Sequence, residues 1–105
     1  MDFDKYQFEA TQTCLPTAYN LEYLIPGLAA EAGEVAGVYA KYVRDETHYT
    51  NLRDDMTKEM GDVLWFLAVL ADRLDVDLSV IAQANIRKLQ DRQKRGVLKG
   101  SGNER

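Results

Sequence analysis

The segment EAGEV at residues 31–35 returns as EMGDV at residues 59–63, so an acid, a second residue, a glycine, an acid and a valine occur twice in the same order. On a helix, residues three apart lie on one face, and each copy would therefore project two carboxylates in the same direction. Four carboxylates facing one another would repel strongly without a cation between them. We interpret the doubled segment as the frame of a divalent metal site.

Start and stop signals around this segment predict an all-α chain, because no strand pattern persists. Asp2 is a candidate N-cap, Pro16 would end the first helix, and Gly96 would stop the last one. We expect residues 15–26 to form an ordered loop beside a ligand pocket. The expected helices cover about residues 3–14, 26–45, 51–74 and 78–95. The predicted organisation is one all-α domain at residues 1–95, followed by a glycine-rich basic tail at residues 96–105.

Two features of the helices predict more than one copy of the chain. Residues 63–71 are apolar at every position, and a helix that is apolar all round is buried on all sides. Four short helices cannot surround this stretch alone, so we expect a homodimer or a homotetramer. Gly27, Gly33 and Gly37 lie inside a predicted helix, where each costs about 1 kcal/mol relative to alanine. Close approach of another helix would explain them.

Composition and charge exclude several classes of protein. The 105 residues suffice for one domain, and the net charge of −4 argues against a dedicated nucleic-acid-binding protein. The single Cys14 excludes an internal disulfide and a cysteine-rich zinc site, and the single His48 excludes a histidine-based metal cluster and is taken to exclude a Ser/His/Asp triad. The acidic N-terminus is unlike a secretory signal, and no apolar run reaches the roughly 18 residues of a membrane span. We therefore expect a cytoplasmic location and no membrane partner.

The charge is distributed unevenly along the chain. Residues 87–105 hold seven Lys and Arg against two acids, a net charge of +5, whereas the remainder carries −9. Within this basic end, Asn85, Lys88 and Arg92 are spaced as one stripe of a helix, which we call the basic stripe. Carboxylates without histidine suit Mg²⁺, with Mn²⁺ as a substitute, and Mg²⁺ commonly takes further ligands from phosphates. An acidic site and a basic stripe together predict hydrolysis of a nucleotide-like substrate.

Two aromatic residues are candidates for a base pocket. Tyr19 falls in the expected ordered loop, and Trp65 follows the second acidic pair. The alternative for Trp65 is a place in the core or at a subunit interface, which is the more frequent role of such a residue in an apolar stretch.

The acids resemble the signature of a known family, the MazG-like all-α nucleotide pyrophosphohydrolases: ExxE on one helix and ExxD on the next. The similarity extends through residues 27–35, 59–65 and 85–89, and covers most of residues 20–105. The resemblance implies a four-helix bundle completed by homo-oligomerisation, Mg²⁺ dependence, and cleavage of a (deoxy)nucleoside triphosphate to the monophosphate and pyrophosphate. It implies that the metal ligands and catalytic residues are Glu31, Glu34, Glu59 and Asp62. It implies phosphate contacts at Asn85, Lys88, Arg92, Lys99 and Arg105.

Two other classes of function compete with this hydrolase. In the first, the chain is a non-catalytic helical interaction module, whose apolar residues 63–71 bind a partner chain and whose acids are vestigial. In the second, residues 87–105 bind nucleic acid, which the acidic remainder of the chain disfavours.

Overall fold

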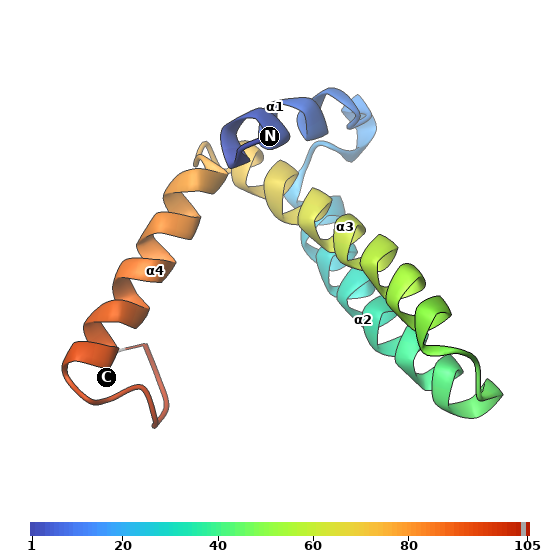
Figure 1. Ribbon diagram of the computed structural model, residues 1–105. Helices are drawn as coiled ribbons and strands as arrows, with labels where there is room; N and C mark the ends of the chain where they lie inside the picture. The colour runs from blue at the N-terminus through green and yellow to red at the C-terminus, as the bar shows by residue number, and fades with distance from the viewer. Residues whose placement is uncertain (104) are drawn as a thin grey trace.

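The computed structural model describes residues 1–103 and 105, and this part of the chain contains helices and no strand. The elements are α1 (Phe3–Gln12), a 3₁₀ turn (Pro16–Ala18), α2 (Leu21–Asp45), α3 (Tyr49–Arg73) and α4 (Leu78–Lys94). Helices α2 and α3 form a long antiparallel hairpin, α1 crosses its open end, and α4 leaves the same end in another direction (Figure 1). The predicted all-α class is confirmed. None of the described helices offers an apolar stretch long enough to span a bilayer.

The N-terminus of α2 differs from the predicted one. The helix begins at Leu21, five residues before Pro26, because the Asn20 side chain accepts a hydrogen bond from the Tyr23 amide at 2.9 Å. An asparagine cap of this kind pairs an amide that the first turn leaves without a helical partner. Pro26 therefore lies inside the helix, and the loop expected at residues 15–26 is wrong for residues 21–26. Similarly, α3 begins at Tyr49 with His48 at the N-cap position, two residues before the predicted start.

The hairpin is held by a close contact between its helices. A Cβ atom placed on Gly27 would lie 2.2 Å from Cε1 of Phe66, whose side chain is buried. This glycine therefore permits the two helices to approach, as the sequence predicted. Gly33 and Gly37 differ, since a Cβ at either would meet no described atom within 4 Å. The described part of the chain therefore leaves space for a second helix beside these two glycines.

One buried glutamine fastens α1 to the corner between α3 and α4. The Gln7 side-chain amide donates to the carbonyl oxygens of Ala68, at 3.2 Å, and Val76, at 3.0 Å. Its side-chain oxygen accepts from the Leu78 amide at 2.9 Å. Gln7 thereby pairs the first amide of α4, the role an N-cap side chain usually has. The corner from which α4 departs is fixed by α1.

Helix α4 projects away from the α2–α3 hairpin, so a single chain is not compact. Its apolar side chains at Val80, Ile81, Ile86 and Leu89 are all more than a third exposed, so this helix buries no continuous apolar face against the rest of its own chain. The radius of gyration is 16.6 Å, against about 13 Å for a compact chain of this length. The accessible surface is 7,899 Å², against about 5,900 Å² for a folded monomer of this mass. The four helices do not close into a bundle within one chain.

The apolar stretch at residues 63–71 is buried only in part. Phe66, Ala68, Val69 and Ala71 are buried, whereas Leu67 is 41% exposed. One chain thus covers most of this stretch: Val63, Leu64, Trp65 and Leu70 are half-buried, and Leu67 is exposed. Coverage of the stretch by a second copy stays a prediction.

Candidate metal centre

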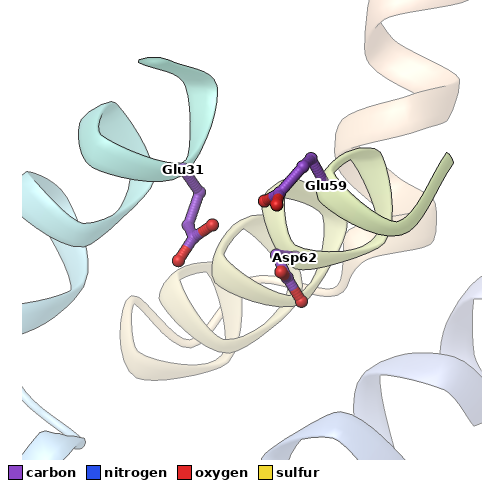
Figure 2. Close-up of side chains that lie close together, drawn as sticks. All are labelled: Glu31, Glu59 and Asp62. Carbon is purple, nitrogen blue, oxygen red and sulfur yellow. The ribbon is translucent and has the colours of Figure 1, made fainter. Parts of the chain in front are cut away.

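Three of the four predicted acids meet between α2 and α3. Glu31 extends from α2 toward Glu59 and Asp62 on α3 (Figure 2). One carboxylate oxygen of each lies within 4.8 Å of the others. We call these three residues the acidic cluster. Glu31 and Glu59 are partly buried, and Asp62 is exposed.

The antiparallel register explains why these positions meet. Gly27 packs on Phe66, and four residues, or about one helical turn, separate Gly27 from Glu31 on α2 and Phe66 from Asp62 on α3. Because the helices run in opposite directions, a step of one turn forward on α2 matches a step of one turn backward on α3. The close contact at Gly27 therefore places Glu31 opposite Asp62, and Glu59 lies three residues before Asp62 on the same face.

The acids repel one another in the absence of a cation. Burial raises the pKa of the Glu31 carboxyl, as do the negative charges of Asp62, Glu59 and Glu34 and a hydrogen bond with Glu59. The ion pairs among the described residues join Arg44 to Asp45 and Arg95 to Asp91, so neither neutralises this cluster. Three hard oxygen donors that lack a counter-charge in the described structure fit a divalent cation such as Mg²⁺.

Glu34 stands beside the cluster and is not part of it. Its side chain is exposed on α2, and no oxygen of it belongs to the group that meets within 4.8 Å. Its charge nevertheless contributes to the raised pKa of Glu31. The structure therefore brings together three of the four predicted ligands and leaves the fourth nearby.

A tyrosine near Asp62 was not predicted from the sequence. Tyr6 of α1 packs against the core, and its pKa is raised by burial and by the negative charge of Asp62. The phenol of α1 therefore lies near enough to Asp62 to be affected by its charge, although no hydrogen bond joins the two side chains in the described structure. Only the crossing of α1 over the hairpin brings the two residues together, and no spacing in the sequence signals it.

The two residues predicted for a base pocket have their polar atoms engaged elsewhere. The Trp65 indole N–H donates to Thr13 Oγ1 at 2.7 Å, and the Tyr19 hydroxyl donates to Asp72 at 2.6 Å. The Arg73 guanidinium lies over the Tyr19 ring, 5.9 Å from its centroid. Both residues fasten the segment after α1 to α3, and any contact with a base would use the ring faces.

The basic stripe lies away from the acidic cluster of the same chain, because α4 diverges from the hairpin (Figure 1). Asn85 and Lys88 are exposed, whereas Arg92 is only 5% exposed. Of the two predicted contacts in the tail, Lys99 is exposed and Arg105 is turned toward the tail's own backbone.

Comparison with known proteins identifies the family. Residues 19–97 match the MazG nucleotide pyrophosphohydrolase domain. The chain belongs to the MazG family. The matched region of this MazG chain contains α2, α3 and α4, and with them the acidic cluster and the basic stripe, whereas Tyr6, Lys99 and Arg105 lie outside it. The resemblance predicted from the sequence is confirmed, and the family implies a pyrophosphohydrolase.

A relative supports the same grouping over the full length. The Gene 37 protein of Mycobacterium phage L5 is 41% identical to this MazG chain over 114 aligned positions, which cover all of both chains. No solved structure matches the chain.

Proposed function

We propose that this MazG protein is a homo-oligomeric, Mg²⁺-dependent hydrolase that cleaves a (deoxy)nucleoside triphosphate to the monophosphate and pyrophosphate. Such an activity would control nucleotide pools or clear unwanted nucleotides. The observation that carries the proposal is the acidic cluster of Glu31, Glu59 and Asp62 between two helices of a MazG chain. Mn²⁺ would replace Mg²⁺ with the same oxygen ligands.

The acidic cluster would hold the cation through Glu31, Glu59 and Asp62. The cation would neutralise charge on the phosphate oxygens and lower the pKa of water in the site. Glu34 is exposed and one turn from Glu31, so its carboxylate can rotate toward the cluster as a further ligand or hold the attacking water in line. A carboxylate within hydrogen-bond reach of that water can accept its proton. Tyr6 would donate a hydrogen bond at the α1 side of the cluster.

The basic stripe would reach the substrate through assembly. Asn85, Lys88 and Arg92 lie on an arm that leads away from the acids of their own chain, so the stripe of one copy would meet the cluster of another. Lys99 and Arg105 would extend the basic end beyond the helix. A stable interface takes about 800 Å² from each partner. The surface of this chain exceeds the expectation for a compact monomer by about 2,000 Å², which leaves room for a homodimer or a homotetramer.

The hairpin itself offers a surface for such a contact. An apolar groove runs between α2 and α3, beside the acidic cluster. Gly33 and Gly37 of α2, where a Cβ would meet no described atom within 4 Å, would let a second helix approach closely. The groove is lined by Ala32, Val35, Met60, Gly61, Val63, Leu64 and Leu67. Burial of apolar surface of this kind stabilises association at about 25 cal/mol per Å² before the costs of ordering.

A panel of deoxynucleoside and nucleoside triphosphates with Mg²⁺, assayed for release of monophosphate and pyrophosphate, tests the proposal. Asp62→Asn and Glu34→Gln should lower turnover by about 100-fold or more, because each removes a charge from the site without changing its size. Glu22→Gln is the matched control, since Glu22 lies in the exposed first turn of α2. Release that survives both site substitutions at the unsubstituted rate would overturn the proposal.

Thermal melting separates the hydrolase from the alternative, a non-catalytic interaction module that the exposed apolar face of α4 would also suit. A ligand that binds only the folded state raises the melting temperature. The hydrolase predicts a rise with Mg²⁺ that disappears in Glu31→Ala. The module predicts the same melting temperature with and without Mg²⁺ in both proteins.

A further inference from the structure

The described part of the tail, residues 96–103 and 105, folds back along α4. At the end of the helix the Val97 amide donates to the Arg92 carbonyl at 2.9 Å, and the Gly96 amide donates to the Gln93 carbonyl at 3.2 Å. This pair of bonds is the Schellman motif, which needs a left-handed residue, and Gly96 has a φ of +72°. The turn sends the tail back over the side of α4 that carries Lys88 and Arg92.

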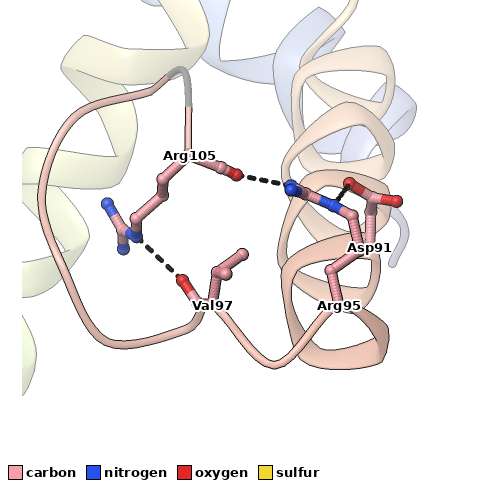
Figure 3. A network of polar contacts seen from close by, with 4 residues as sticks. All are labelled: Asp91, Arg95, Val97 and Arg105. Carbon is pink, nitrogen blue, oxygen red and sulfur yellow. Dashed lines mark hydrogen bonds and ion pairs between the residues drawn. The ribbon is translucent and has the colours of Figure 1, made fainter.

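The last residue closes the tail into a loop. The Arg105 guanidinium donates to the carbonyls of Val97, at 3.1 Å, Leu98, at 3.1 Å, and Gly102, at 2.8 Å. The Arg105 carbonyl accepts from the Arg95 guanidinium, so both ends of the loop are tied to the end of α4 (Figure 3). Hydrogen bonds from a charged donor are worth more than neutral ones. The Arg105 guanidinium therefore stabilises the folded conformation of the tail.

The closed loop covers Arg92 and contacts Lys88, which stays exposed to solvent. Arg92 is 5% exposed, and its Nη2 lies 3.3 Å from the Gly102 carbonyl and 3.5 Å from the Asn103 side-chain oxygen. Lys88 Nζ lies 3.4 Å from the same Asn103 oxygen. The neutral Asn103 side-chain oxygen is thus the acceptor for both positive groups, and both hydrogen bonds are long and therefore weak. A buried guanidinium and an ammonium that share one acceptor form a good receptor for an anionic oxygen.

We propose that the tail is a strap over the Lys88–Arg92 pair, and that the Asn103 side-chain oxygen occupies the position of a phosphate oxygen. This inference rests on the proposed function in one respect, the assignment of the basic stripe to phosphate. The strap competes with the ligand. A diphosphate or triphosphate group displaces it, because charged oxygens bind the two cations more strongly than an amide oxygen does. A ligand that offers only one weak hydrogen-bond acceptor does not displace the tail.

Calorimetric titration of the full-length protein with inorganic pyrophosphate in metal-free buffer tests the strap. Without metal the acidic cluster takes no part, so the measurement reports on the basic end alone. Asn103→Ala removes the competing oxygen and should tighten pyrophosphate binding about threefold, the effect of losing weak hydrogen bonds. Asn103→Asp replaces it with a carboxylate and should weaken binding about tenfold. Ser101→Ala should leave the affinity unchanged, because Ser101 lies in the same tail and its side chain makes no hydrogen bond in the described structure.

Opposite effects of the two Asn103 substitutions are the required result. Weaker or unchanged binding in Asn103→Ala would overturn the strap, and so would equal affinity in Asn103→Ala and Asn103→Asp. Lys88→Ala separates the strap from the phosphate assignment. If Lys88→Ala abolishes pyrophosphate binding while the Asn103 variants leave it unchanged, the strap is wrong and the basic stripe stands. If pyrophosphate binds neither the unsubstituted protein nor Asn103→Ala, the strap and the assignment of the basic stripe to phosphate are both wrong. This conclusion does not depend on the result of the nucleotide hydrolysis assay.

Discussion

Replacing Gly27 with alanine should destabilise the hairpin that forms the acidic cluster. The new Cβ would lie 2.2 Å, 2.6 Å and 3.0 Å from three ring atoms of Phe66, where carbon atoms normally stay about 3.5 Å or more apart. The ring cannot move freely, because it is 7% exposed and packs edge-on against Trp65 with 4.9 Å between centroids. Overpacking of this kind costs about 1–3 kcal/mol, and a clash this short belongs at the upper end.

Alanine also favours the helix by about 1 kcal/mol relative to glycine. We therefore expect a net loss of about 2 kcal/mol in the free energy of unfolding, or roughly 10 °C in melting temperature for a chain of this size. Part of the strain would be relieved by separation of α2 from α3. Since Glu31 lies one turn from Gly27, this separation should also reduce metal binding by the cluster.

Urea unfolding followed by circular dichroism, at one fixed protein concentration, measures the effect. Gly37→Ala is the control, because a Cβ there would meet no described atom within 4 Å. In an isolated chain it should stabilise α2 by up to about 1 kcal/mol. Equal or greater stability in Gly27→Ala would refute the contact with Phe66 as the determinant of helix spacing. A loss in Gly37→Ala would instead indicate that a second copy packs on that part of α2.

Two further predictions concern the α1 corner and the acidic cluster. Gln7→Ala should cost about 2–4 kcal/mol in urea unfolding, since it leaves two carbonyls and the Leu78 amide without their partner. Gln7→Glu should destabilise at least as much at neutral pH, because its carboxylate has no proton to donate and would face the Ala68 and Val76 carbonyl oxygens at a buried position. A loss below about 0.5 kcal/mol in Gln7→Ala would contradict this role. The second prediction is that the Mg²⁺-induced rise in melting temperature becomes smaller as the pH is lowered from neutral toward the raised pKa of Glu31. Because the pKa of Glu31 is raised in the folded state, protonation of Glu31 stabilises the metal-free fold at low pH, and this stabilisation is lost as the pH rises through that pKa. Binding of the cation needs the ionised carboxylate instead, so protons and Mg²⁺ compete for this residue. An Mg²⁺ effect that is constant across this range would contradict the competition.

Much of the helical layout was predictable because its signals are local. Asp2 accepts from the Lys5 amide at 2.8 Å, as an N-cap should, and Gly96 ends α4 in the left-handed conformation. The predicted start of α2 was wrong because two local sequence signals compete in this region. Pro26 fits the first turn of a helix, but Asn20 caps an earlier turn, and a proline near the N-terminus of a helix disrupts few of its bonds.

The acidic cluster was predictable for a similar reason. A repeated i, i+3 pattern on two antiparallel helices places acids face to face once one close contact sets the register, and Gly27 supplies that contact. Tyr6 was not predictable, because its approach to Asp62 depends on how α1 crosses the hairpin. The direction of α4 was not predictable either. Its apolar stripe is readable in the sequence, whereas the surface it covers depends on the corner that Gln7 holds.

The open shape gives the uneven charge of the chain a structural meaning. Residues 87–105 carry +5 and the remainder −9, and α4 holds the basic end apart from the acidic hairpin. Charges separated in this way favour pairing between copies, because the basic end of one chain is complementary to the acidic hairpin of another. Such pairing would bring the basic stripe to the acidic cluster. Under the proposed function, an isolated chain holds both halves of the site without joining them, and activity should then rise with protein concentration until assembly is complete.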